Sequence, residues 1–247
     1  MDLTDFYKEH FSNLCCYEDY LMRIDLMGKK HNDKEVLSSL PKCNKHRYII
    51  SNGEIIWIDG NGDRVDNPNI TRIPYSAFEF CNDIQRVVVP DSVTSIGEYA
   101  FYGCKNLESI TIPNGVEEIE TGVFRGCSDL KSVTIPSSVK SIGNDAFLGC
   151  IGLNSVTIPV GVTDIGNYAF YGCSGLTSVT IPSSVKRIGY QSFWACRKIE
   201  SVIIPDSVTS IEKCAFVGCD NLKSVKVPKN CKISWGAFPP DCSVQYY

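Results

Sequence analysis

Cysteine is the residue with the most chemical potential in this sequence, and most of its copies keep a fixed spacing. Eight of the 13 cysteines stand 23 residues apart, at Cys81, Cys104, Cys127, Cys150, Cys173, Cys196, Cys219 and Cys242. If that spacing reflects stacked structural units, equivalent side chains point the same way and do not aim their sulfurs at one another. A free cysteine also fills a core well as a small apolar side chain. We therefore predict a ladder of buried thiols.

The other five cysteines lie off this spacing, at Cys15, Cys16, Cys43, Cys214 and Cys231. Cys214 and Cys231 fall in adjacent units, so a disulfide between them stays open as an alternative. The odd total leaves at least one thiol free, which fits a reducing or anaerobic setting better than an oxidising one. No C-x-x-C pair occurs, so the sequence does not indicate a zinc site.

Histidines and carboxylates do not form a recognisable catalytic or metal-binding pattern. The three histidines, His10, His31 and His46, all precede the repeated region. Glu117, Glu118 and Glu120 could pair for acid-base chemistry, but they have no histidine or glycine-rich loop beside them. We therefore predict no catalytic residue, no cofactor and no metal.

The run Asp59, Asn61, Asp63 is similar to the start of a calcium-binding loop. Arg64 stands where such a loop needs glycine, and Ile70 stands where it needs the closing glutamate. We interpret this run as a polar turn.

The 23-residue period extends to the residues that would build the fold. Prolines recur from Pro90 to Pro228 and phenylalanines from Phe78 to Phe216 with the same step. Each unit has a short alternating apolar run ending in proline, which predicts a strand, and a compact A-F-x-G-C segment where the chain turns. Because one such unit cannot bury its own apolar side, units must stack into a solenoid with parallel strands about 4.8 Å apart.

The repeated unit resembles the BspA-like leucine-rich repeats, whose pattern is L-x-x-I-x-I-P-x-x-V-x-x-I-x-x-x-A-F-x-x-C. The match covers about residues 70 to 242. The resemblance implies a curved leucine-rich-repeat solenoid, mainly parallel β with short helical turns, used for adhesion or protein recognition. It also implies a secreted or cell-surface location, whereas a native start at Met1, without a leader, would favour the cytoplasm.

The chain ends depart from the repeat. Residues 1–45 carry apolar positions at helical spacing, which predicts an α-helical N-terminal cap. Residues 46–69 contain two apolar runs around Ser51-Asn52-Gly53, which predicts a β-hairpin or an aberrant first coil. Residues 70–247 form the repeat array, and its last coil is degenerate because Ile233 and Phe238 come one residue early.

Composition narrows the classes of partner. The formal net charge of -4 offers no basic field, so we do not expect nucleic-acid binding. No run of 18 apolar residues occurs, so we do not expect membrane insertion. We expect a monomer that binds a protein ligand.

Because consensus positions supply the core, recognition must use the variable positions. The position after each phenylalanine is enriched in aromatic residues, and further tyrosines lie in the same turns. Tyrosine, tryptophan and arginine are common anchors of protein interfaces. We predict a binding ridge formed by Tyr99, Tyr102, Arg125, Tyr168, Tyr171, Tyr190 and Trp194. The alternative is that these rings lie flat and only cover the edge of the solenoid.

The sequence thus favours a non-catalytic protein-binding solenoid that acts in adhesion or in recognition of a host or partner protein. An intracellular scaffold or effector-like interaction module is the alternative.

Overall fold

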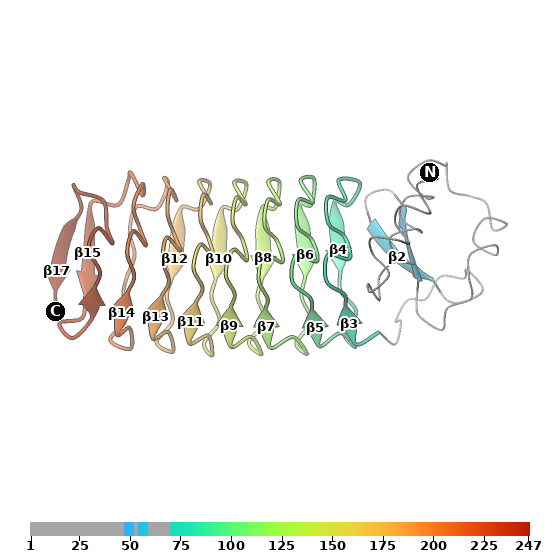
Figure 1. Cartoon of the computed structure of the whole chain (residues 1–247), viewed down its shortest axis with the longest axis horizontal. Helices are drawn as coiled ribbons and strands as arrows, with labels where there is room; N and C mark the ends of the chain where they lie inside the picture. Colours follow the sequence, from blue (N-terminus) through green and yellow to red (C-terminus); the bar gives the residue numbers. More distant parts are fainter. Residues whose placement is uncertain (1–46, 52–53, 59–69) are drawn as a thin grey trace, which may run out of the picture.

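The coils of the repeat array stack side by side along the long axis of the molecule (Figure 1). The computed structural model describes residues 47–51, 54–58 and 70–247. Each regular coil contributes one strand to each of two sheets, and a longer turn segment joins these two strands on one edge. The architecture is therefore a parallel β-solenoid.

The first sheet has seven strands in the order β1-β2-β4-β6-β8-β10-β12. β1 (Arg47–Ser51) and β2 (Glu54–Ile58) pair antiparallel. The later strands are parallel, and they are β4 (Arg86–Val88), β6 (Ser109–Thr111), β8 (Ser132–Thr134), β10 (Ser155–Thr157) and β12 (Ser178–Thr180). A bridge between Ile203 and Lys226 leads on to β15 (Ser224–Val227), which pairs with β17 (Ser243–Tyr246).

The second sheet has six strands in the order β16-β14-β13-β11-β9-β7. They are β7 (Glu118–Ile119), β9 (Ser141–Ile142), β11 (Asp164–Ile165), β13 (Arg187–Ile188), β14 (Ser210–Ile211) and β16 (Lys232–Ile233). A parallel pair, β3 (Arg72–Ile73) with β5 (Ser95–Ile96), precedes it in the first coils.

In both sheets, paired residues of neighbouring strands are separated by the 23-residue period of the sequence. Val133 pairs with Val156, and Ile142 pairs with Ile165, each across one 23-residue step. In the degenerate last coil Ile233 still pairs with Ile211, 22 residues before it. The stack therefore absorbs the missing residue in a loop and keeps its core positions aligned.

The turn segments are not helical, so the predicted short helical turns are wrong. No helix occurs in the described residues. The amide of Ala100 donates to the carbonyl of Gly97, three residues back, but the amides of Tyr99 and Phe101 donate to the next coil. Tyr99 and Gly103 also have φ angles of 57° and 69°. Because a left-handed residue every fourth position interrupts a right-handed helix, the segment folds as successive turns.

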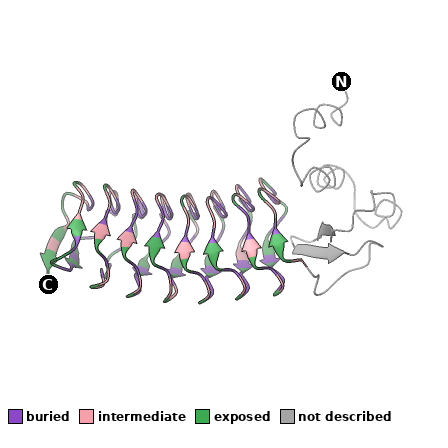
Figure 2. Cartoon of the chain, turned by 60° about the horizontal axis from the view of Figure 1, so that its bottom comes forward, coloured by how far each residue is buried: buried purple, intermediate pink, exposed green. Residues whose placement is uncertain are grey.

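A column of stacked phenylalanines forms the centre of the core. Consecutive rings lie 5.0 to 5.8 Å apart between centroids, with interplanar angles of 20° or less. The column runs through Phe78, Phe101, Phe124, Phe147, Phe170, Phe193, Phe216 and Phe238. The strands also bury one side: in β8 only the middle residue, Val133, is buried. Every coil of the array has both buried and exposed residues (Figure 2).

The predicted helical cap at residues 1–45 lies outside the described residues, as does most of the predicted segment at 46–69. The two domain boundaries therefore stay predictions.

Replacing one ring of the phenylalanine column tests how much the column contributes to the stability of the fold. We expect Phe147→Ala to lower the free energy of unfolding by about 3–5 kcal/mol, because it removes a fully buried ring and leaves a cavity. Urea denaturation measures the change. Leu148→Ala is the control, since this neighbouring side chain is half-buried on the surface and should cost much less. Equal losses would contradict the assignment of the column as the main core element.

Candidate functional site

The turn segments present their variable side chains along one edge of the solenoid. We define this turn edge by residues 75–83, 98–106, 121–129, 144–152, 167–175, 190–198 and 213–221, which lie between the second-sheet and first-sheet strands of successive coils. All seven residues of the predicted ridge lie on it.

A left-handed backbone position shapes the turn edge. Seven equivalent residues have φ between 50° and 61°, namely Ser76, Tyr99, Gly122, Asp145, Tyr168, Gln191 and Cys214. Only one of them is glycine, although left-handed backbone disfavours other residues by about 1 kcal/mol. Hydrogen bonds to the next coil offset this cost, such as Tyr168 N–H to Tyr190 O at 2.8 Å. Sequence reasoning missed this feature because tyrosine and glutamine, which occupy three of the seven positions, carry no signal for positive φ.

The N-terminal part of the turn edge carries an aromatic cluster of Tyr75, Phe80, Tyr99 and Tyr102. The Phe80 and Tyr102 centroids are 4.7 Å apart, and Tyr99 makes edge contacts with Tyr75 at 5.9 Å and with Tyr102 at 6.0 Å. The Arg125 guanidinium lies 5.6 Å from the centre of the Tyr102 ring. We call this group the N-terminal cluster.

Phe80 and Tyr75 were not among the predicted ridge residues. Phe80 is 52% exposed, and it occupies the column in which the following coils carry Gly103, Gly126 and Gly149. Its ring lies where a Cβ on Gly103 would be. This departure from the consensus glycine is the signal that could have identified it.

The C-terminal part carries a second aromatic cluster of Tyr168, Tyr171, Tyr190 and Trp194. Tyr171 and Trp194 stack with centroids 4.5 Å apart and planes at 9°. Tyr168 lies 5.9 Å from Tyr171 and 5.2 Å from Tyr190, perpendicular to the latter. All four side chains are partly exposed. Because Tyr171 and Trp194 stack on each other, the rings of this C-terminal cluster are already arranged before a partner binds.

An ion pair lies between the two clusters along the stack. Arg125 Nη1 lies 2.9 Å from Asp145 Oδ2, with the carboxylate side chain 19% exposed. Burial raises the pKa of Asp145, and Arg125 opposes that rise. The pKa of the Tyr99 phenol is raised by burial first and by the Asp145 charge second. The predicted ridge is therefore two aromatic clusters separated by a charged centre.

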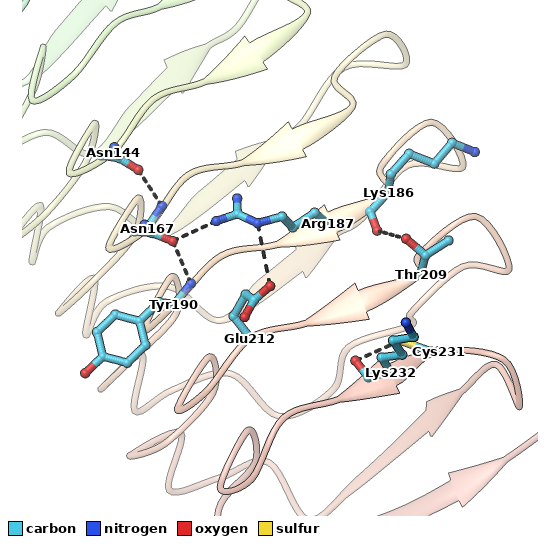
Figure 3. Close-up of polar contacts among 9 residues, drawn as sticks. All are labelled: Asn144, Asn167, Lys186, Arg187, Tyr190, Thr209, Glu212, Cys231 and Lys232. Atoms are coloured by element: carbon cyan, nitrogen blue, oxygen red, sulfur yellow. Dashed lines mark hydrogen bonds and ion pairs between the residues drawn. The ribbon is translucent and has the colours of Figure 1, made fainter.

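Asparagine side chains hold the C-terminal cluster to the sheet beside it (Figure 3). Asn144 Oδ1 accepts the Asn167 amide at 2.8 Å, and Asn167 Oδ1 accepts the Tyr190 amide at 2.9 Å. Arg187 Nη2 also donates to Asn167 Oδ1 at 3.0 Å, and its Nε lies 3.7 Å from Glu212. These contacts fix the backbone that carries Tyr190.

The predicted thiol ladder is present in the core. Seven of its cysteines are fully buried, and all ten described cysteines are free, including Cys214 and Cys231. Each thiol from Cys104 to Cys219 donates to the carbonyl of the phenylalanine 26 residues before it, at 2.9 to 3.2 Å. That carbonyl also accepts a turn amide, as Phe124 O does from Cys127 N–H. Cysteine therefore fits this column as an apolar side chain with a weak donor that links coils.

The eighth cysteine departs from the ladder. Cys242 is only half-buried, and its amide donates to Pro239, whereas the Cys219 amide donates to Phe216. Because Phe238 comes one residue early, Cys242 is displaced by one position from its phenylalanine.

The carboxylates considered for chemistry make surface contacts. Glu117 pairs with Lys140 at 3.0 Å, and Glu120 accepts a hydrogen bond from Ser95 at 3.4 Å. Within the described ranges no three His, Cys, Asp or Glu side chains form a group that could hold a metal ion. The histidines and the Asp59, Asn61, Asp63 run lie outside those ranges.

The fold and its period define a leucine-rich-repeat solenoid. The model of the BspA type leucine rich repeat region matches residues 64–167 and 140–246. The chain therefore belongs to this family, as the sequence resemblance predicted. In the residues described by the structure, no helix is long and apolar enough to span a membrane.

Two solved structures share the architecture. A leucine-rich repeat protein from Bacteroides ovatus is 27% identical, with a TM-score of 0.56 over 77% of this chain and 66% of that one. The T. pallidum leucine-rich repeat protein is 30% identical, with a TM-score of 0.59 over 71% of this chain and 87% of that one. No curated protein matches the chain.

The buried thiols make stability depend on alkaline pH. Burial raises the pKa of Cys150 and Cys173 well above the ordinary range, and that of Cys219 to about 12. Because the folded pKa exceeds the unfolded one, each thiol's contribution is present below about pH 8.5 and is lost as pH rises through the folded pKa. We expect the free energy of unfolding to fall from about pH 9 upward, by up to about 1.4 kcal/mol per pH unit for each thiol.

Urea denaturation at several alkaline pH values measures this slope. The double variant Cys150→Ala/Cys173→Ala should show a shallower slope than the wild type, because two of the titrating groups are gone. Ile142→Val is the control, since it weakens the same core while keeping every thiol. Identical slopes in the cysteine variant and the wild type would contradict the prediction.

Proposed function

We propose that this chain is a non-catalytic protein-binding solenoid that holds a partner protein against its turn edge. The observation that carries the proposal is the pair of preformed aromatic clusters with the Arg125–Asp145 ion pair between them. Leucine-rich-repeat arrays offer extended surfaces on which separate coils contact one ligand. The family assignment supports an interaction role of this kind.

The composition of the turn edge favours protein recognition. Tyrosine and tryptophan supply large contact areas with few rotatable bonds. Tyr171 and Trp194 stack on each other, and Asn167 holds the backbone amide of Tyr190. Stacking holds these rings in place before binding, so little side-chain entropy is lost when a partner docks.

The first-sheet face is a weaker candidate. Its exposed column runs through Thr111, Thr134 and Thr157 in strict register. Threonines of this kind favour strands and offer little individuality. We therefore place recognition on the turn edge.

The physiological role that fits this surface best is adhesion or recognition of a host or partner protein. A scaffold inside the cell is the second candidate. It is favoured by the free state of all ten cysteines that the structure describes, since free thiols persist in reducing compartments. Labelling of intact cells with a membrane-impermeant reagent separates the two, because only a surface protein takes up the label.

Removing the stacked pair of the C-terminal cluster tests the binding role. We expect Tyr171→Ala/Trp194→Ala to weaken partner binding by at least about 2 kcal/mol, roughly 30-fold, because aromatic anchors dominate interface energies. The wild type and the variant, both full-length, are immobilised, and the proteins that each captures are compared. The protein that the wild type captures most strongly is then titrated against both.

The control variant is Thr134→Ala/Thr157→Ala, which removes two exposed side chains from the first-sheet face. It should bind as the wild type does. Thermal denaturation of both variants checks that the array stays folded. Undiminished binding by the aromatic variant would retire the turn edge as the binding site.

A further inference from the structure

Charge is distributed unevenly along the solenoid. Residues 70–167 carry eleven carboxylates against six lysines and arginines, whereas residues 168–247 carry five carboxylates against nine. The first half of the array is thus at net charge -5 and the second half at net charge +4. The nearly balanced total hides this polarity.

The turn edge shows the same polarity. Five carboxylates and two cations lie on its first four segments, whereas three cations and one carboxylate lie on its last three. Glu79, Asp83 and Glu98 share the turn segments of the N-terminal cluster. Arg197 and Lys198 share the turn segment of Trp194, and Lys213 begins the next segment. The two aromatic clusters offer a partner similar rings in opposite electrostatic settings.

The cations near the C-terminal cluster are available to a partner. Lys198 follows Trp194 in the same turn, is exposed, and has no ion-pair partner among the described residues. Lys213 is also exposed, and its Nζ lies 5.6 Å from the ring centre of Trp235, which is 83% exposed. Arg197 makes only a long contact of 3.9 Å with Asp220. This end of the turn edge thus combines exposed aromatic surface with uncompensated positive charge.

We propose that the C-terminal half of the turn edge binds an acidic segment of the partner protein, so that the partner lies along the solenoid in one orientation. The proposal rests on the binding role of the turn edge argued above. Covering Lys198 and Lys213 removes water from their charges, and within a protein partner carboxylates compensate that loss best because they carry the opposite charge. The same acidic segment is repelled by Glu79, Asp83 and Glu98, which excludes the reversed orientation.

The partner chemistry is therefore a protein segment rich in glutamate or aspartate that also carries aromatic or apolar side chains. Its carboxylates meet Lys198 and Lys213, and its apolar groups meet Trp194 and the rings stacked beside it. Lys226 and Lys229, which are also exposed and lie in the same half, are on and beside strand β15, away from the turn edge. Lys226 and Lys229 also attract an acidic segment, but neither lies in a turn segment that carries the C-terminal cluster.

Two synthetic polymers test the charge preference on the full chain. The probes are a random copolymer of glutamate and tyrosine and the matching copolymer of lysine and tyrosine, titrated by calorimetry. We expect the acidic copolymer to bind, with an affinity that falls as salt concentration rises. Failure of the acidic copolymer to bind overturns the proposal.

Charge reversal locates the site. We expect Lys198→Glu/Lys213→Glu to weaken binding of the acidic copolymer by about tenfold or more. Lys226→Glu/Lys229→Glu is the matched control, with the same change in net charge on exposed lysines, and it should retain binding within about threefold. If both variants lose the same affinity for the acidic copolymer, the binding depends on the overall positive charge of this half and not on a local site. That result overturns the proposal.

The natural partner separates this proposal from the binding role itself. If Tyr171→Ala/Trp194→Ala loses the partner and Lys198→Glu/Lys213→Glu keeps it, the turn edge is the binding site but its acidic preference is wrong. If the aromatic variant also keeps the partner, both proposals fail together.

Discussion

The hydrogen bonds between adjacent coils are the constraint on which the rest of the structure depends. In each of the first six turn segments three alternate amides donate to carbonyls of the next coil, as Phe124 N–H does to Ala146 O at 2.8 Å. A coil therefore cannot shift along its neighbour without breaking a whole set of bonds. This fixes equivalent residues above one another, so that each column of the sequence becomes a line in space.

Once the columns are fixed, each one has a single physical task. The phenylalanine column fills the centre, and the cysteine column packs beside it while its thiols donate to phenylalanine carbonyls. Gly143, Gly166 and Gly189 form another such column, because a Cβ at Gly166 would lie 2.5 Å from the backbone of Gly143. Residues with these tasks are not free to recognise a ligand. The surface columns are free, and the aromatic clusters lie there.

Sequence reasoning could predict the parts of the fold that repeat. The register, the strands that end at proline, and the buried phenylalanines and cysteines all follow from the period, because each is reinforced in several coils. It could not predict the local conformation of the turns. Non-glycine residues such as Tyr99 and Asp145 adopt positive φ there because the stack supplies their hydrogen bonds, and the expected helical turns do not form.

The candidate site was predictable in its location but not in its internal contacts. The aromatic column after phenylalanine places Tyr102, Tyr171 and Trp194 on one edge. The division into two clusters follows from the columns, because the two middle coils carry no aromatic residue there. The Arg125–Asp145 ion pair in those coils could not be predicted, since its two members come from different columns and adjacent coils. Such a contact depends on how long a side chain is and where its neighbour points, and the period alone says nothing of either.

The charge polarity follows from the same freedom of the surface columns. Each coil contacts only its neighbours, so carboxylates gathered in one half and lysines in the other are not brought together by the fold. Most exposed charges interact weakly in water and are screened within about 8–10 Å. A gradient along the axis therefore costs little stability. The gradient means that a partner contacts negative charge at one end of the array and positive charge at the other. Because the core columns are nearly identical in every coil, only such surface differences distinguish the two ends.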